Sequence, residues 1–281
     1  MKKIMKNIFI GFVLIINTVS CVDMERSVLF AGNSKNSDYN FSELKIPKDS
    51  WELVKMNYGN CDNYGLYVKG KNDVYKDKIV LFFHGNGGRI DKGTQIEMAN
   101  FFYENGINFF AMEYRGYGQS SGFTTTEAST YEDAQYAYNY LLTIDSGKFK
   151  DGNIIIMGHS LGSAVAIDLA TKENEKSLIT MSAFTDFTNE LKGFTSFDIP
   201  GSWISDAKYD NINKIDKINS NVLFIHGSND KMVSPSNSKD LFNKARGTKK
   251  LMIVEGAGHD DIGEKLDDKT KAEIIKMVSD N

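Results

Sequence analysis

The sequence of 281 residues is poor in side chains that bind metals. It has only two cysteines, Cys21 and Cys61, and four histidines, and these do not cluster with the spacing of a zinc site. The HExxH pattern of zinc proteases is also absent. We therefore expect no metal site and no cofactor.

The chain also lacks a surplus of positive charge. Its 33 lysine and arginine residues are outnumbered by 37 acidic residues, which gives a net charge of −4. Because binding of nucleic acid needs a concentrated basic surface, this balance argues against a nucleic-acid partner. Hydrophobic residues make up 41% of the chain, which is ample for a core. We find no internal repeat and no long low-complexity run.

The longest apolar run lies at the N-terminus, in MKKIMKNIFIGFVLIINTVSC. Lysines at its start, a run from Ile8 to Ile16 that is short for a membrane span, and small residues near Cys21 are typical of an export signal. An uncleaved membrane anchor is the alternative. We expect a signal peptide over 1–21, a polar tether over 22–44 and a single folded domain over 45–281.

The end of this segment resembles a bacterial lipoprotein signal, in which the cysteine at the cleavage point receives the lipid. It departs from such signals at Thr18, where they usually carry leucine. If Cys21 is lipidated, Cys61 is a lone thiol; otherwise the two can form a disulfide in an oxidising compartment. We expect an exported protein of the cell envelope, either anchored at the membrane or secreted.

Beyond the tether, short apolar runs alternate with longer amphipathic stretches. Near-continuous hydrophobicity in the short runs is typical of parallel strands that are covered on both faces. The alternation predicts one α/β domain with a doubly wound, mostly parallel sheet, whose ligand crevice lies beyond the carboxyl ends of the strands. Strands are predicted at 79–83, 107–112, 154–157, 178–181, 222–225 and 251–254. Helices are predicted at 92–105, 126–142, 161–172, 236–245 and 269–278.

Residues 184–219 break this alternation with aromatic residues and no strand pattern. We expect a small helical lid insert over the carboxyl edge of the sheet. Its aromatic residues either pack the insert onto the domain or line an apolar substrate pocket, and the sequence leaves both interpretations open. The residues concerned are Phe184, Phe187, Phe194, Phe197, Pro200 and Trp203.

The stretch IIIMGHSLGSAVA places Ser160 between a predicted strand and a predicted helix. Gly-x-Ser-x-Gly alone is a weak signal in a chain with 24 glycines, but this context strengthens it. A sharp strand-to-helix turn strains the serine and needs the space that Gly158 and Gly162 leave. We predict Ser160 as a nucleophile, with the N–H of Leu161, at the helix N-terminus, as one donor to an oxyanion.

A serine hydroxyl is a weak nucleophile and needs a base, which in turn needs an orienting acid. His84 and His226 each precede glycine at a strand end, where a ring more often braces a loop. His159 lies in the turn itself but on another side of it. His259, between glycine and aspartate after the last strand, is free to reach inward, and we predict it as the base.

Asp230 follows the strand at 222–225, where a carboxylate can accept the imidazole N–H and stabilise the imidazolium. Asp260 and Asp261 adjoin the base but would have to fold back on their own backbone. The second oxyanion donor is expected in HGNGG after the first predicted strand, at the N–H of Asn86 first and of Gly87 second.

Five motifs, HGNGG, EYRGYGQSSG, GHSLGS, HGSND and GAGH, occur in the order and rough spacing of the α/β-hydrolase superfamily. From about Lys45 to the C-terminus the chain resembles this superfamily, and most of all its BEM46-like branch of serine hydrolases (the ABHD13-type and ABHD12-type proteins). The resemblance implies a sheet of the α/β-hydrolase type. It implies these roles: Ser160 as nucleophile, Asp230 as acid, His259 as base, and Asn86 and Leu161 as oxyanion donors.

One departure from the branch is Glu113, where an aspartate often precedes YRGYG. We expect Arg115 and Tyr117 of this motif to brace the strand end, so that the change leaves catalysis intact. A dinucleotide-binding reading of Gly116 and Gly118 fails because the third glycine, Gly122, comes one residue late for GxGxxG.

These features predict a monomeric serine hydrolase that cleaves carboxylic ester or thioester bonds of small-molecule or lipid-derived substrates through an acyl-enzyme on Ser160. The aromatic insert and the N-terminal segment suggest the lipid-derived class. Two alternatives remain. One is a serine peptidase of the prolyl-oligopeptidase type, although no propeller domain precedes the core. The other is a non-catalytic binding protein on the hydrolase fold.

Overall fold

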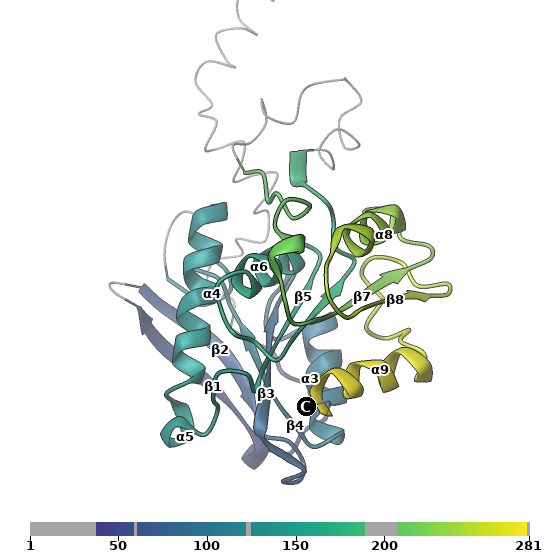
Figure 1. Cartoon of the computed structure of the whole chain (residues 1–281). Helices are drawn as coiled ribbons and strands as arrows, with labels where there is room; N and C mark the ends of the chain where they lie inside the picture. Colours follow the sequence, from purple (N-terminus) through teal and green to yellow (C-terminus); the bar gives the residue numbers. More distant parts are fainter. Residues whose placement is uncertain (1–37, 59–60, 122–124, 189–206, 280–281) are drawn as a thin grey trace, which may run out of the picture.

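The structure is a computed structural model that describes residues 38–58, 61–121, 125–188 and 207–279. Within these ranges, one sheet has the strand order β1-β2-β4-β3-β5-β6-β7-β8. Strand β2 is antiparallel to both of its neighbours, and every later pair is parallel. The doubly wound, mostly parallel sheet predicted from the sequence is therefore confirmed (Figure 1).

The elements follow the chain in the usual alternation. The strands are β1 (Trp51–Tyr58), β2 (Cys61–Val68), β3 (Tyr75–Phe83), β4 (Ile107–Met112), β5 (Ile154–His159), β6 (Ser177–Met181), β7 (Asn221–Gly227) and β8 (Lys249–Val254). The helices are α3 (Thr94–Glu104), α4 (Glu127–Leu141), α5 (Ile144–Gly147), α6 (Leu161–Ala170), α8 (Pro235–Lys244) and α9 (Asp268–Ser279), with short 3-10 turns η1 (Lys48–Ser50) and η3 (Ile215–Lys217). None of these helices combines the length and apolarity needed to cross a membrane.

The central strands are buried on both faces because their side chains point alternately into two cores. In β3, Leu81 lies in the core that includes α4, α6 and α8, whereas Val80 and Phe82 lie in the core that includes α3 and α9. Full burial of a side chain of this size stabilises the fold by roughly 1.5–3 kcal/mol. Burial on both sides explains why these strands have continuous apolar runs in the sequence.

The sequence pattern does not predict the hairpin of β1 and β2 at the edge of the sheet. In β1 only Met56 is buried, and β2 mixes polar with apolar residues. Strands at the edge of a sheet that expose one face have alternating apolar and polar residues, so they give no continuous apolar run. Gly65 in β2 lets the ring of Phe110 lie against the backbone, since a Cβ there would come 2.2 Å from that ring.

The folded part begins before residue 45. The last residues of the predicted tether, 38–44, pack on the domain: the Asn40 N–H donates to Asp91 at 2.7 Å, and the Gln119 N–H donates to the Tyr39 hydroxyl at 3.0 Å. Tyr39 and Phe41 also pack against the core beside α3. The predicted signal peptide with Cys21, and the rest of the tether, lie outside the described residues.

The structure describes both ends of the predicted lid insert, 184–188 and 207–219. These ends lie side by side, because the Phe187 N–H donates to Lys208 O at 2.8 Å and the Ile212 N–H donates to Thr185 O at 2.9 Å. Phe184 and Phe187 both meet the ring of Tyr209 edge to face. The other predicted lid residues, Phe194, Phe197, Pro200 and Trp203, lie outside the described residues.

Candidate active site

Ser160 stands in a strained turn between β5 and α6. Its φ of 53° and ψ of −118° are unusual for a residue with a side chain and cost roughly 1–3 kcal/mol. The flanking glycines are needed for space: a Cβ on Gly158 would lie 2.1 Å from Gly162 O, and one on Gly162 would lie 2.0 Å from Phe83 O. The predicted role of the two glycines is therefore explained by close backbone contacts.

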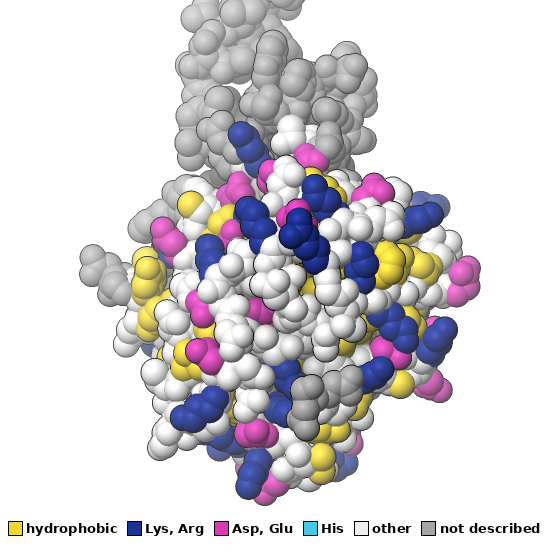
Figure 2. Space-filling view, in the orientation of Figure 1, with side chains coloured by type: hydrophobic (Ala, Val, Ile, Leu, Met, Phe, Trp, Pro, Cys, Tyr) yellow, Lys and Arg dark blue, Asp and Glu magenta, His cyan; other side chains and the backbone are white. Residues whose placement is uncertain are grey.

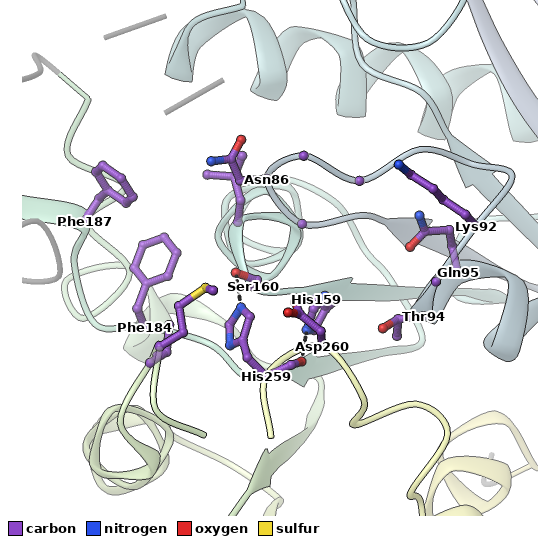
Figure 3. Close-up of a pocket in the computed structure, with 17 residues that line it drawn as sticks. Asn86, Lys92, Thr94, Gln95, His159, Ser160, Phe184, Phe187, His259 and Asp260 are labelled. Atoms are coloured by element: carbon purple, nitrogen blue, oxygen red, sulfur yellow. Dashed lines mark hydrogen bonds between the residues drawn. The ribbon is translucent and has the colours of Figure 1, made fainter. Parts of the chain in front are cut away.

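The side chains of Ser160, His259 and Asp230 meet at the carboxyl edge of the sheet. His259 Nε2 lies 2.9 Å from Ser160 Oγ, and the two residues are 99 positions apart in sequence. On the other side of the ring, Nδ1 lies 2.7 Å from Asp230 Oδ2. With the proton on Nδ1, the ring donates to the carboxylate and accepts the serine hydroxyl (Figure 3). The structure thus brings together the three residues that sequence reasoning selected.

Asp230 is held as a charged acceptor by the loop after β7. Its Oδ1 accepts the N–H groups of Met232 and Val233, each at 2.9 Å. Burial acts to raise the pKa of Asp230, but hydrogen bonds from His226, His259 and the Val233 N–H outweigh burial and hold this pKa well below its usual range. These hydrogen bonds therefore favour the ionised carboxylate.

The loop after β8 packs directly on the loop after β7. The Asn229 N–H donates to Ala257 O at 2.9 Å. A Cβ on Gly227 would lie 2.3 Å from the same carbonyl oxygen, so only glycine permits this approach. The contact holds together the two loops that carry Asp230 and His259.

All four histidines are buried, and none shows on the face drawn in Figure 2. His226 Nδ1 lies 2.7 Å from Ser238 Oγ, and its Nε2 lies 3.0 Å from Val233 O. His84 Nδ1 lies 2.8 Å from Gly85 O, and its Nε2 lies 2.9 Å from a carboxylate oxygen of Glu113. Both rings brace loops, as the sequence indicates for a histidine before glycine at a strand end.

Sequence reasoning missed the part that His159 plays. Its Nε2 lies 3.0 Å from the backbone oxygen of His259, and the two rings are 5.1 Å apart. Burial, together with the charge of His259, lowers the pKa of His159 to about 3, so the ring is neutral and donates its Nε2–H to that oxygen. His159 therefore fixes the backbone that carries the predicted base. A histidine next to the serine is the only signal of this role in the sequence.

The loop of HGNGG lies against the serine turn. A Cβ on Gly85 would come 3.2 Å from Ser160 Cβ, so a larger residue would push the loop away. The Tyr117 hydroxyl donates to Asn86 Oδ1 at 3.1 Å and faces the N–H of Gly87. Asn86 and Gly87 both line the cavity beside Ser160, so the predicted order of the two oxyanion donors stays a prediction.

The EYRGYG motif braces this edge of the sheet from α4. Arg115 Nε donates to Asp133 Oδ1 at 2.8 Å, and the Arg115 N–H donates to Asp133 Oδ2 at 2.8 Å. The Ile90 N–H donates to the carboxylate of Glu113 at 3.2 Å, close behind the HGNGG loop. Arg115 and Tyr117 therefore act as braces, as the sequence indicates.

Ser160 opens into a cavity of about 490 Å³ whose two sides differ in chemistry. Figure 3 shows Phe184 and Phe187 on one side of the serine and Lys92, Thr94 and Gln95 on the other. We call the first the aromatic wall and the second the α3 wall. We group with the aromatic wall the other apolar side chains of the lining, so that it comprises Leu161, Phe184, Phe187, Met232 and Val233. The α3 wall comprises Lys92, Gly93, Thr94 and Gln95, and the loop 85–88 with His159, His259 and Asp260 completes the lining.

Comparisons with known proteins agree with this geometry. Residues 75–206 match the sequence family described as serine aminopeptidase, S33. Alpha/beta hydrolase domain-containing protein 17B of Homo sapiens is 35% identical over 235 residues, which cover 82% of this chain and 75% of the relative. Protein bem46 of Schizosaccharomyces pombe is 34% identical over 217 residues, which cover 74% and 69%. The chain belongs to the BEM46-like α/β hydrolases.

Solved structures show that this BEM46-like hydrolase shares its fold with esterases. An esterase of Pyrococcus furiosus superposes with a TM-score of 0.71 at 17% identity, over 86% of this chain and 94% of the esterase. Est1E from Butyrivibrio proteoclasticus, with ferulic acid bound, has a TM-score of 0.68 at 17% identity, over 80% and 99%. At such identity the likeness concerns the fold alone. Together with the family, it makes the chain a hydrolase of the serine α/β type.

Proposed function

We propose that this hydrolase cleaves carboxylic esters or thioesters through an acyl-enzyme on Ser160. The observation that carries the proposal is the continuous chain of hydrogen bonds from Ser160 Oγ through His259 to Asp230, at 2.9 and 2.7 Å. A serine hydroxyl becomes a useful nucleophile only when a base of this kind removes its proton.

The chemistry follows from these contacts. Ser160 Oγ attacks the substrate carbonyl while His259 Nε2 takes its proton, and Asp230 stabilises the imidazolium. The N–H groups of Asn86 and Leu161 bind the developing oxyanion, and one such donor is commonly worth roughly 10²–10³ in rate. His259 then protonates the departing alcohol or thiol. Water attacks the acyl-enzyme by the same route and releases the carboxylic acid.

The aromatic wall supports an apolar acyl group, and we propose lipid-derived substrates on this ground. Phe184 is almost fully buried in the core, which fixes its ring, while Met232 is 47% exposed. A wall that combines a fixed aromatic ring with a flexible thioether can accept acyl chains of different lengths.

A peptidase is the second candidate, because the matched sequence family is described as a serine aminopeptidase. An aminopeptidase must bind the free α-ammonium group of its substrate, for which acidic side chains are the usual partners. Asp260 is the acidic residue of the described cavity lining. This single carboxylate supports a peptidase less strongly than the five apolar side chains of the aromatic wall support an ester with an apolar acyl group.

The test is a series of 4-nitrophenyl esters of rising acyl length, run beside aminoacyl 4-nitroanilides. We expect turnover of the esters, with kcat/KM rising with acyl length beyond acetate, and loss of turnover in Ser160→Ala. A sharp optimum at acetate would contradict the lipid-derived class. Preference for the anilides would favour the peptidase, and failure to turn over any of them would favour a non-catalytic binding protein.

We further propose that the hydrolase is exported and held at the membrane through residues 1–21, by a lipid on Cys21. The support is the pattern of lysines, apolar run and cysteine in the sequence. Cys21→Ser should move the protein from the membrane fraction to the soluble fraction, measured by immunoblot after ultracentrifugation. Unchanged fractionation would contradict lipidation.

A further inference from the structure

We propose that the α3 wall is a binding site for an anionic group, a carboxylate or a phosphate, on the leaving half of the substrate. The inference rests on the proposed function, because Ser160 lies between the two walls and the aromatic wall suits the acyl half. A substrate that spans the cavity then places its alcohol or thiol half against Lys92, Thr94 and the start of α3.

Lys92 supplies the positive charge. Two cations follow the HGNGG loop, but only one is available: Arg89 Nε and Nη2 donate to Asp91 at 2.9 and 3.0 Å. Lys92 Nζ has no ion-pair or hydrogen-bond partner among the described residues, and its side chain is exposed and lines the cavity. A bound anion would supply an ion-pair and hydrogen-bond partner for this ammonium group.

Thr94 supplies a hydroxyl for which no partner is found within the described residues. The residue is only 4% exposed, and no hydrogen bond to its Oγ1 is found within the described residues. Its methyl group faces Gly263, where a Cβ would lie 3.1 Å from Cγ2, so the hydroxyl turns to the cavity (Figure 3). A hydroxyl that faces the cavity and has no protein partner is free to form a hydrogen bond with a ligand oxygen.

The first turn of α3 adds backbone donors. Gly93, the N-cap, has φ 70° and ψ −151° and no side chain to cap the helix. Its carbonyl accepts from Ile96 and Glu97 at 2.9 and 3.2 Å, but no acceptor is found for the N–H groups of Thr94 and Gln95 among the described residues. Free N–H groups at a helix N-terminus favour an anion. The Gln95 side chain is already engaged, since its Nε2 donates to Arg89 O.

Asp91, next to Lys92, is paired with Arg89, and the acidic side chains of Glu97 and Asp260 also lie near this wall. Glu97 turns away from the cavity, because its carboxylate lies against the backbone of Gly263. Asp260 lines the cavity beside His259 and is exposed. Its charge opposes a bound anion through solvent, so Asp260→Asn should strengthen the preference for anionic substrates.

The kinetic test compares two butyrate esters that differ by one carboxylate, 4-nitrophenyl butyrate and 3-carboxy-4-nitrophenyl butyrate, each corrected for its rate of hydrolysis by hydroxide. The quantity is the ratio of kcat/KM for the anionic ester to that for the neutral ester.

We expect Lys92→Gln to lower this ratio about fivefold to tenfold and Thr94→Val to lower it about threefold. Lys231→Gln, an exposed lysine on the loop of the aromatic wall, is the matched control and should keep the parent ratio. Added salt should lower the ratio in the parent and not in Lys92→Gln.

A binding measurement separates this inference from the proposed function. In Ser160→Ala, calorimetry should give a lower Kd for the anionic ester than for the neutral one, and Lys92→Gln added to that variant should remove the difference. Equal Kd values would overturn the anion site even if both esters are hydrolysed. A difference that depends on Lys92 would sustain the site even if neither ester is turned over.

Discussion

At the centre of the site each predicted catalytic side chain is hydrogen-bonded to the next, whereas on the α3 wall Lys92 Nζ and Thr94 Oγ1 have no partner among the described residues. The centre comes from loops after β5, β7 and β8, and the α3 wall comes from the start of one helix. A reaction that is the same for many substrates needs catalytic side chains that are already held in position before the substrate binds. Recognition of one substrate class needs polar groups whose missing hydrogen-bond or ion-pair partner is supplied by the substrate. The walls are therefore where the substrate should be sought.

The largest loss of activity is expected from substitutions at the centre of the site. Because Ser160 and His259 act on the same proton, His259→Ala and Ser160→Ala should each lower kcat by roughly 10⁴-fold or more, and the double variant should lose little further. Steady-state kinetics on a 4-nitrophenyl ester measures this. Additive losses in the double variant would contradict a single hydrogen-bonded unit.

The next effect separates the acid from its brace. Asp230→Asn should keep the fold but lower kcat by about 10⁴-fold, because an amide neither fixes the ring tautomer nor stabilises its charge. His226→Ala should mainly lower stability, by about 2–4 kcal/mol, since it opens a cavity and leaves Ser238 and Val233 O without their partner. It also removes a contact of 3.3 Å with Asp230, so a smaller loss of kcat should accompany the loss of stability.

Thermal unfolding and kinetics on the same two proteins distinguish these roles. If His226→Ala lowers kcat as much as Asp230→Asn while its Tm is unchanged, the assignment of acid and brace is wrong.

A smaller effect is expected on the aromatic wall. Phe187→Ala removes part of the apolar surface beside Ser160, so it should lower kcat/KM for an octanoyl ester about fourfold to tenfold relative to an acetyl ester. The ratio for the carboxylated and neutral butyrates should stay near that of the parent. An equal loss for acetyl and octanoyl esters would mean that the acyl chain does not lie on this wall.

The smallest effect concerns stability far from the site, at the amino edge of the sheet. Burial raises the pKa of Glu175 to about 7, although its hydrogen bond from Ser220 opposes the shift. In the unfolded chain this carboxyl loses its proton near pH 4.3, so stability should fall as the pH rises from about 4.3 to 7.

Glu175→Gln, which stays neutral, should therefore gain about 1–2 kcal/mol over the parent at pH 8 and nothing at pH 4, in urea unfolding followed by circular dichroism. The kcat should not change, because Glu175 lies outside the cavity. A variant that is less stable than the parent at pH 8 would contradict the raised pKa.

The sequence predicts the centre of the site better than its walls. The centre depends on strand ends and short motifs, so continuous apolar runs and glycine spacing suffice to place Ser160, Asp230 and His259 on one edge. The bond from His159 to the base is missed because it joins a side chain to a distant backbone oxygen, which leaves no periodic signal. The β1–β2 hairpin is missed because an edge strand with one exposed face has no continuous apolar run.

The α3 wall is also missed, for a further reason. Its chemistry lies in what Lys92 and Thr94 do not contact, and a sequence pattern cannot report which polar groups lack a partner. Arg89 and Lys92 look alike as cations in the sequence, but in the fold Arg89 is buried and donates to Asp91 and to Asp38 O, whereas Lys92 is exposed.

The most direct measurement is intact-mass spectrometry after treatment with a fluorophosphonate, followed by peptide mapping of the adduct. This reagent reacts with a serine that is activated by a neighbouring base. The account predicts one adduct on the parent protein, located on Ser160, much slower labelling of His259→Ala, and no adduct on Ser160→Ala. A parent protein that stays unlabelled, or an adduct that maps to another residue, would contradict it.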